Sequence, residues 1–234
     1  MGRWFALADL HLSEIGAKPM AIFGDLWRDH AARMARSWDE IVRPDDIVLL
    51  PGDLSWARNL DEARPDLDWI ARRPGTKVLL RGNHDSWWTG AGRVRAALPP
   101  GCHALHHDAL RIDGRVIVGA RGWTAPDDPS AQESDVKVFR RELDRLRLSI
   151  ADADRRFGRE DERIAMLHYP PWIQGRSPTE VVPILADAGV SLCVFGHLHG
   201  EDHALAVTGI HDGIEFLLVA ADAVRFTPVP ILPR

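Results

Sequence analysis

The sequence has few of the features that mark membrane, secreted or nucleic-acid-binding proteins. Among its 234 residues no run approaches the roughly 18 apolar residues that a membrane span needs. Only two cysteines are present, which excludes a disulfide framework. Basic residues number 29 against 34 acidic ones, a formal net charge of −5, so an extended nucleic-acid-binding face is not expected.

What remains is the composition of an ordinary globular protein. Hydrophobic residues make up 45% and charged residues 27%, and a chain of this length fits one hydrophobic core, so we expect a single domain over residues 1–234. The first apolar stretch is broken at Asp9, too early for a signal peptide, which predicts a cytoplasmic protein. Cys193 lies inside an apolar run and is interpreted as a small core residue.

Short apolar runs predict six buried strands, and apolar residues at helical spacing predict three helices. The strands are expected at residues 4–7, 47–50, 77–80, 116–118, 164–167 and 192–195. The helices are expected near residues 27–41, 60–70 and 136–150, with Pro65 splitting or starting the second. Strands and helices alternate through the first hundred residues, which is typical of βαβ units and a parallel sheet.

Two later segments depart from this alternation. Residues 205–226 read as two or three strands with Asp212-Gly213 as a hairpin turn, so an antiparallel C-terminal portion is expected. Residues 122–161 hold a loop and then a long helix whose mixed charges indicate a solvated face. A role of this segment as a lid is the alternative.

Side chains able to bind metal follow five of the predicted strands. They are Asp9 and His11, then Asp53, then Asn83 with His84 and Asp85, then His168, and finally His197 and His199. Loops at the carboxyl ends of parallel strands meet at one edge of a sheet, where ligands bind. One such residue alone is most often a helix cap or turn residue, whereas five clusters at successive strand ends indicate a metal site.

The chemistry of these side chains narrows the choice of metal. In extended backbone, residues i and i+2 point to the same side, so Asp9 with His11 and His197 with His199 are each expected to present two ligands, with the leucine between them facing the interior. The candidate ligands comprise two carboxylates, one amide and four imidazoles, and no thiolate. This set suits Mn, Fe, Zn or Co. Seven side chains are too many for one ion and fit two that share a bridge. Two divalent cations outweigh two carboxylates, which favours an anionic substrate such as a phosphate ester.

The order of these motifs resembles that of the calcineurin-type metallophosphoesterases. The family pattern D-x-H, G-D, G-N-H-D/E, H and G-H-x-H is matched at every position between Asp9 and His199. The resemblance implies an α/β fold in which two mixed β-sheets form a sandwich flanked by helices (αββα). It also implies two divalent metal ions as cofactors, for which we favour Mn.

Carried over by position, the family pattern assigns a role to each of these side chains. It places one ion on Asp9, His11, Asp53 and His199, and the other on Asp53, Asn83, His168 and His197. Asp53 then bridges the two ions, and His84 is a non-ligand that faces the leaving group. The implied mechanism is direct in-line attack of a metal-bridging hydroxide on phosphorus, with Asp53 and His84 as the catalytic residues and His84 protonating the leaving oxygen.

One departure from a branch of this superfamily concerns the residue that orients the catalytic histidine. In protein Ser/Thr phosphatases an acidic residue after the second motif does so, and here Trp56 takes that place, which disfavours a protein phosphatase. Asp85 is interpreted either as the group that orients His84 or as a helix cap.

Four side chains near the motifs are candidate substrate contacts. They are Trp56, Trp88, Trp172 and Arg121. The tryptophans are expected to stack a nucleobase or another flat apolar group, and Arg121 to bind a further anionic group. Core packing of the tryptophans and an ordinary surface charge for the arginine are the alternatives.

The sequence therefore predicts a phosphohydrolase acting on phosphate mono- or diesters of a small or nucleotide-like substrate. A nuclease or pyrophosphatase of the same superfamily is one alternative, and a catalytically inactive protein-binding scaffold is another. A related membrane-associated group that cleaves a lipid pyrophosphate has Gly-Asn-Arg-Asp at the third motif, so His84 disfavours that assignment. The sequence leaves the oligomeric state open.

Overall fold

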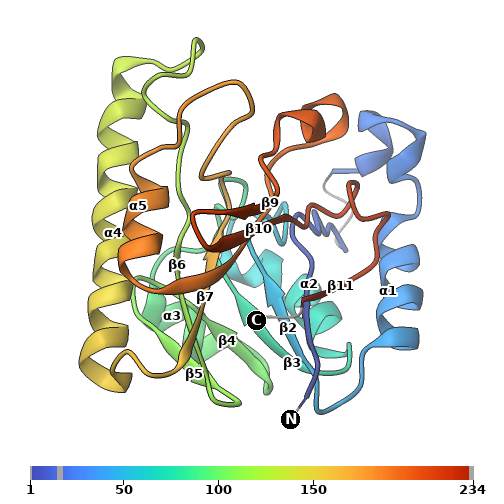
Figure 1. Ribbon diagram of the computed structural model, residues 1–234. Coiled ribbons are helices and arrows are strands. Elements are labelled where there is room, and N and C mark those ends of the chain that lie inside the picture. Colours follow the sequence, from blue (N-terminus) through green and yellow to red (C-terminus); the bar gives the residue numbers. More distant parts are fainter. Residues whose placement is uncertain (1, 15–17, 232–234) are drawn as a thin grey trace.

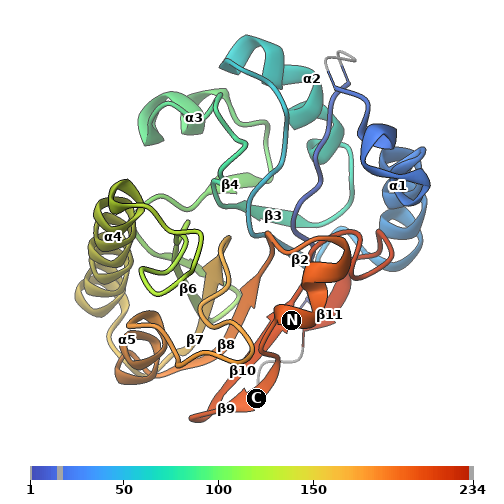
Figure 2. The ribbon, with the colours of Figure 1, turned by 90° about the horizontal axis from the view of Figure 1, so that it is seen from above.

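Two β-sheets packed face to face form the centre of the molecule, and helices cover both outer faces (Figures 1 and 2). The structure is a computed structural model that describes residues 2–14 and 18–231. Strands in the first sheet follow the order β11-β1-β2-β3-β4, and those in the second the order β5-β6-β7-β8-β10-β9. The predicted two-sheet α/β sandwich is thereby confirmed.

All six predicted strands are present, together with the two strands of the C-terminal hairpin and three further strands. The bounds are β1 (Trp4–Ala6), β2 (Ile47–Leu50), β3 (Thr76–Leu79), β4 (Cys102–Ala104), β5 (Leu110–Ile112), β6 (Arg115–Ala120), β7 (Glu162–Leu167), β8 (Val190–Phe195), β9 (Gly209–His211), β10 (Ile214–Leu218) and β11 (Val229–Ile231). The sequence did not indicate β4 and β5, because each has an exposed polar residue at its centre, His103 and Arg111, and so does not read as an apolar run.

Five α-helices and three 3₁₀ turns complete the described part of the chain. They are α1 (His30–Ile41), α2 (Leu60–Ala71), α3 (Ala91–Ala97), α4 (Glu133–Phe157) and α5 (Val181–Asp187), with 3₁₀ turns at Met20–Phe23, Asp25–Trp27 and Gly200–Leu205. Helices α1 to α3 lie over the first sheet and α4 and α5 over the second (Figure 2). No helix in residues 2–14 and 18–231 is both long and apolar enough to cross a membrane.

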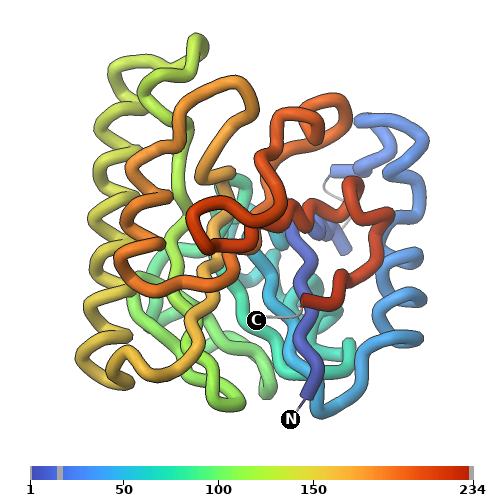
Figure 3. Tube along the Cα trace, in the orientation of Figure 1, coloured from blue at the N-terminus to red at the C-terminus, as the bar shows by residue number. Residues whose placement is uncertain are grey.

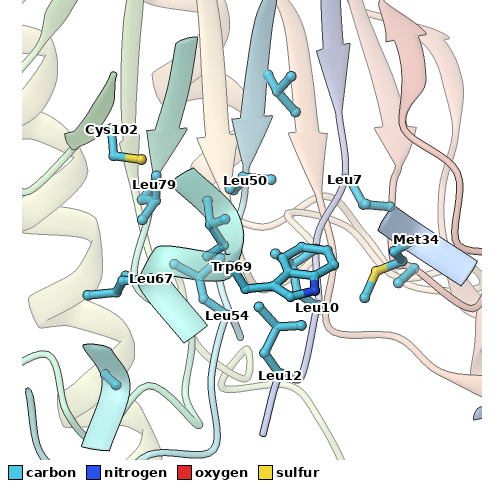
Figure 4. Packing of buried hydrophobic residues seen from close by; sticks show 14 of the residues in the cluster. Leu7, Leu10, Leu12, Met34, Leu50, Leu54, Leu67, Trp69, Leu79 and Cys102 are labelled. Carbon is cyan, nitrogen blue, oxygen red and sulfur yellow. The ribbon is translucent and has the colours of Figure 1, made fainter. Parts of the chain in front are cut away.

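The central strands are mostly apolar because both faces of each sheet are covered. In β1, Trp4 and Ala6 pack between the two sheets, whereas Phe5 packs on the side of α1 to α3. A strand buried on both faces reads as a continuous hydrophobic run. Figure 4 shows the outer cluster of the first sheet, in which Leu10 and Leu12 from the loop after β1 are packed. Leu10 is therefore in the interior, as predicted.

The sheets are mainly parallel, and the C-terminal prediction needs a correction. Strands β9 and β10 form the expected hairpin at Asp212-Gly213, but β10 pairs parallel with β8. The third strand, β11, begins at Val229, beyond the predicted segment, and pairs antiparallel with β1. The last part of the chain thus crosses from the second sheet to the first (Figure 3).

Two helix predictions were wrong in detail. Trp27 belongs to a 3₁₀ turn, and α1 begins only at His30. Pro65 neither splits nor starts α2 but lies inside it. At this place in the second turn the proline removes a single backbone hydrogen bond, the one to the carbonyl of the exposed Asp61. The Asn59 side chain, which accepts a hydrogen bond from the Glu62 amide, caps the start of this helix.

The charged helix within residues 122–161 is α4, and it covers the second sheet. Phe139, Leu143 and Leu146 are buried in the cluster between α4, α5 and the sheet, and most of the charged side chains face outward. The solvated face is thereby confirmed. Because α4 packs on β6, the helix is part of the fold rather than a lid.

Candidate metal centre

The loops that follow β1, β2, β3, β7 and β8 meet at one edge of the sandwich. The amides of Asp9 and His11 donate to the carbonyls of Gly52 and Asp53, at 2.9 Å each, which joins the first two loops. Within this region Asp9, His11 and His199 form one group of potential ligand atoms within 4.8 Å of one another, and Asp9, Asp53 and His168 form a second. The structure thus brings the predicted ligands together.

In the first group, the Nε2 atoms of His11 and His199 lie next to each other. Nε2 of His11 lies 3.4 Å from Nε2 of His199 and 3.8 Å from Oδ2 of Asp53. Nε2 of His199 is also 3.7 Å from Oδ1 of Asp9. These four side chains are the set that the family pattern assigns to one ion.

A second set of contacts, which joins Asn83, His168 and His197 to Asp53, gathers around the amide oxygen of Asn83. This oxygen lies 2.7 Å from Nε2 of His168 and 3.1 Å from Nδ1 of His197, and Nε2 of His168 is 3.4 Å from Oδ2 of Asp53. Nδ1 of His168 donates to the Pro51 carbonyl at 3.0 Å, so Nε2 of the neutral ring is an acceptor facing another acceptor. A proton or a metal ion satisfies such a contact, and the donor set therefore fits a cation.

Four of the ligand residues have left-handed backbone, which few residues other than glycine adopt. They are Asp9 (φ 59°), His11 (φ 45°), Asp53 (φ 53°) and His197 (φ 72°). Such conformations cost free energy and cluster at functional sites. Each i, i+2 pair therefore converges through a turn and not through the extended backbone expected from the sequence, since only His199 is extended.

Glycines in three motifs leave room for the ligand side chains. A Cβ on Gly82 would overlap Oδ1 of Asp53, and one on Gly196 would overlap Oδ2 of Asp9. Gly52 has a φ of +92°, and a Cβ there would lie 2.8 Å from Nδ1 of His168. The motif glycines are thus required by close approach to the ligands.

Replacing Gly82 by Ala is expected to lower the amount of divalent metal that the protein binds. The new methyl group displaces the Asp53 carboxylate, which lies in the centre of the ligand cluster. Gly92→Ala in α3 is the matched control, because nothing lies within 4 Å of a Cβ at that position. Elemental analysis of both variants after reconstitution with Mn tests this, and equal metal content in the two would contradict it.

Burial dominates the electrostatics of the cluster. It raises the pKa of Asp9 to about 7 and lowers the pKa of His197 to about 3. For His168, burial is outweighed by the carboxylates of Asp53 and Asp9, which raise its pKa to about 9. The metal-free cluster thus retains protons on buried groups, and metal binding is expected to release them.

Two residues that the sequence did not single out support the ligand loops. Oδ1 of Asp222 is 2.9 Å from Nδ1 of His199, and its Oδ2 accepts a hydrogen bond from the Gly200 amide at 3.0 Å. A carboxylate on the far nitrogen of a ligating histidine fixes its ring and tautomer. His30 holds the first loop through a 3.1 Å contact of Nε2 with the Leu10 carbonyl. Neither residue stands at a fixed spacing from a motif, so no sequence signal marked them.

Asp85 has a role different from both that were predicted for it. Its Oδ1 accepts hydrogen bonds from the amides of Leu54 and Ser55 at 2.9 and 3.1 Å, and its Oδ2 from the Gly82 amide at 2.8 Å. It is buried and contacts backbone amides rather than the His84 ring. Asp85 therefore ties the loop after β2 to the loop after β3.

His84 stands beside the ligand cluster with its ring accessible. Its side chain is 44% exposed, and its Nε2 is 4.0 Å from Oδ2 of Asp53. The His84 amide donates to Oδ1 of Asp53 at 2.8 Å. Burial lowers the pKa of the imidazole, although the Asp53 carboxylate opposes this effect.

Two clefts open next to the cluster. The first, which we call the apolar cleft, has a volume of about 320 Å³ and is lined by His11, Met20, Phe23, Leu26, Trp27, Trp56, His84, His199, Gly200 and Asp222. The second has a volume of about 270 Å³, and its lining includes His197, Tyr169, Trp123, Asp128 and Arg176. The loop at the start of residues 122–161 therefore borders the site although α4 does not.

Of the candidate tryptophans, the structure places only Trp56 in the apolar cleft. One face of its ring stacks on His11, with centroids 5.0 Å apart at 19°, and the Lys18 ammonium lies 3.5 Å from the ring centroid. Trp27, which stands at the start of the helix expected near residues 27–41, packs edge-on against His11 and His199.

The other three candidate substrate contacts are engaged elsewhere. Trp88 is 1% exposed in the core of the first sheet, where its Nε1 donates to His106. Trp172 donates to the Arg176 carbonyl and packs against the outer cluster of the second sheet. Arg121 pairs with buried Glu142 at 3.1 Å. These three residues line neither cleft, so for the tryptophans the alternative of packing describes the structure.

Comparison with known proteins agrees with this geometry. The sequence profile of the family described as calcineurin-like phosphoesterase matches residues 3–201. The Gene 66 proteins of Mycobacterium phages L5 and D29 are 32% identical over 111 residues and 41% identical over 85 residues, or 47% and 35% of this chain. The matches span 45% and 39% of those proteins, so the chain covers less than half the length of the curated relatives it matches.

Solved structures show the same fold. Phosphopantetheinyl hydrolase (PptH) from Mycobacterium tuberculosis is similar with a TM-score of 0.62 and 18% identity over 100% of this chain and 96% of that one. The protein TT1561 of Thermus thermophilus gives 0.55 and 15% over 91% of each chain. A protein of unknown function from Aquifex aeolicus, AQ665, gives 0.53 and 14% over 98% and 95%.

Proposed function

The chain belongs to the calcineurin-like phosphoesterase family, and we propose that it is a metal-dependent phosphohydrolase that cleaves phosphate mono- or diesters of a small or nucleotide-like molecule. The observation that supports this most is the buried convergence of carboxylate, amide and imidazole ligands in two groups around Asp53. This donor set suits Mn, Fe, Zn or Co, of which we favour Mn.

The family pattern assigns the residues that would hold the ions, and the contacts above support this assignment. One ion would bind Asp9, His11, Asp53 and His199, and the other Asp53, Asn83, His168 and His197. Bound there, the two ions would supply Lewis-acid stabilisation of the phosphoryl group and activate the attacking water. The chain itself orients the ligands: Pro51 and Asp222 accept from the far nitrogens of His168 and His199.

His84 supplies the proton for the leaving group in this proposal. Its ring is exposed to the apolar cleft and belongs to neither ligand group. Burial lowers the pKa of this imidazole, and the Asp53 carboxylate, 4.0 Å from Nε2, offsets part of that effect. As the bond from phosphorus to the leaving oxygen breaks, Nε2 passes its proton to that oxygen.

Turnover of generic esters tests the proposed function. After reconstitution with Mn, the protein is expected to hydrolyse p-nitrophenyl phosphate, its bis-ester or both. Chelation of the metal should abolish this turnover, and added Mn should restore it. Fully reconstituted protein that hydrolyses neither ester would favour the inactive scaffold.

Replacing Asp222 by Asn is expected to weaken metal binding about 10- to 100-fold, because the far nitrogen of His199 loses its carboxylate partner. Calorimetric titration of the metal-free protein with Mn measures this. Glu201→Gln is the matched control, since Glu201 is an exposed carboxylate two residues after His199. Unchanged Mn affinity in Asp222→Asn would remove the assigned positioning role.

A further inference from the structure

Several apolar side chains line the apolar cleft, although hydrolysis at phosphorus does not itself require them. Two consecutive 3₁₀ turns, Met20–Phe23 and Asp25–Trp27, supply four of its side chains. Met20 and Trp27 are buried, whereas Phe23 and Leu26 are 54% and 49% exposed. A single exposed hydrophobic side chain is ordinary, but here two of them line one concave surface. Such a surface is typical of a site for an apolar group.

Apart from the imidazoles of the ligand cluster and His84, Asp222 is the only ionisable side chain among the described residues that line this cleft, and its carboxylate is already engaged. Asp222 contacts His199, His203 and the Gly200 amide. Trp56 has His11 on one face and Lys18 close to its ring, so it presents an edge rather than a free face for stacking. The lining of the cleft therefore favours an apolar group over a stacked base, and the Lys18 ammonium, which lies 3.5 Å from the Trp56 ring centroid and 5.0 Å from that of Phe23, disfavours a cationic group.

The position of His84 decides which part of the substrate enters the cleft. His84 lines the same cleft as Phe23 and Leu26. In the proposed reaction its Nε2 protonates the leaving oxygen, so the carbon attached to that oxygen lies at the same place. The group in the cleft is thus the departing alcohol, and the phosphate remains at the ligand cluster.

We infer that the substrate is a phosphate ester of an apolar alcohol, whose apolar part binds between Phe23, Leu26 and Trp56. This inference rests on the proposed phosphohydrolase function. Hydrolysis breaks the bond between phosphorus and the alcohol oxygen, water adds its hydroxyl to phosphorus, and the proton from His84 leaves with the alcohol. The proton that water loses restores His84 for the next cycle.

Ethyl and hexyl phosphates, each as the monoester and as the methyl diester, test this with the Mn-loaded protein. Ethanol and hexanol are similar leaving groups, so a difference in kcat/KM reports on the cleft. Each buried methylene is expected to raise kcat/KM about two- to fourfold, so the hexyl ester should exceed the ethyl ester at least about tenfold. Leu26→Ser and Phe23→Ser should each lower this hexyl-to-ethyl ratio about threefold or more.

Ile22→Ser is the matched control. Ile22 is 64% exposed on the same 3₁₀ turn as Phe23 but does not line the cleft, so its variant should keep the ratio of the parent protein. Melting temperatures of the three variants show whether any of them fails to fold. If Ile22→Ser lowers the ratio as much as Leu26→Ser does, the assignment to the cleft is wrong.

Binding of hexanol, followed by saturation-transfer NMR, gives a readout that needs no turnover. Hexanol should bind the parent protein and bind Leu26→Ser at least about threefold more weakly. Equal hydrolysis of both esters without hexanol binding would overturn the inference and leave the proposed function standing. Hexanol binding without hydrolysis of any ester would overturn the proposed function, and the leaving-group assignment with it, while showing that the cleft binds apolar molecules.

Discussion

Asp53→Asn is expected to release both metal ions and to abolish phosphoesterase activity. Oδ2 of Asp53 lies 3.4 Å from Nε2 of His168 and 3.8 Å from Nε2 of His11, so one carboxylate serves both ligand groups. An amide has one oxygen and no negative charge, so it cannot replace a bridging carboxylate. We expect fewer than one ion per chain after reconstitution with Mn, against two in the parent protein, as measured by elemental analysis.

Variants of two further carboxylates show whether the loss of both ions is specific to Asp53. Asp9→Asn should weaken mainly one of the two sites, leaving about one ion per chain. Asp61→Asn is the matched control, because Asp61 is exposed on α2 and, among the residues that the structure describes, its ion-pair partner is Arg64 at 3.1 Å. Two ions retained by Asp53→Asn, or a single ion in the parent protein, would contradict the shared site.

His84→Ala is expected to lower kcat about 10²- to 10⁴-fold for an alkyl ester while the metal content stays unchanged. The imidazole belongs to neither ligand group, and the amide of residue 84, which bonds to Asp53, is retained in the variant. The loss should be smaller for p-nitrophenyl esters, because a leaving group of low pKa needs less protonation.

Metal analysis and kinetics on the two ester types separate the possible roles of His84. Loss of an ion from His84→Ala would make it a ligand, and an equal loss of kcat on both ester types would remove the proton-donor role. His103→Ala, an exposed histidine on β4 outside the site, should change neither quantity.

The sequence predicted correctly those features that depend on the residues of one short segment, such as a strand that is buried on both faces. The central strands read as apolar runs because both of their faces are covered, as Phe5 and Ala6 show on opposite sides of β1. It failed for features that a short segment does not show or that depend on the surrounding structure. Strands β4 and β5 each have an exposed polar residue at their centre and so do not read as apolar runs, and Pro65 is tolerated because α2 loses only one hydrogen bond.

The substrate contacts show the same limit. Trp56 and Trp88 each follow a ligand motif by a few residues, and nothing in their local sequence separates them. The structure buries Trp88 beside Trp87 and His106 and leaves Trp56 in the apolar cleft. The sequence did not identify Phe23 and Leu26 as cleft residues, because they line the cleft only through the two 3₁₀ turns that place them beside His84.

The sequence by itself determined the fold class and the family, and it marked the candidate ligand side chains and their order, because each group of candidates follows a strand within a few residues and each of these strand ends reaches the same edge. Only the tertiary structure decided the left-handed turns that aim Asp9 and Asp53, the pairing of Asp222 with His199 and the cleft beside His84. Asp222 reaches the site because the segment after β10 pairs with Ala8. Contacts between segments so far apart in the chain depend on packing, which no local pattern encodes.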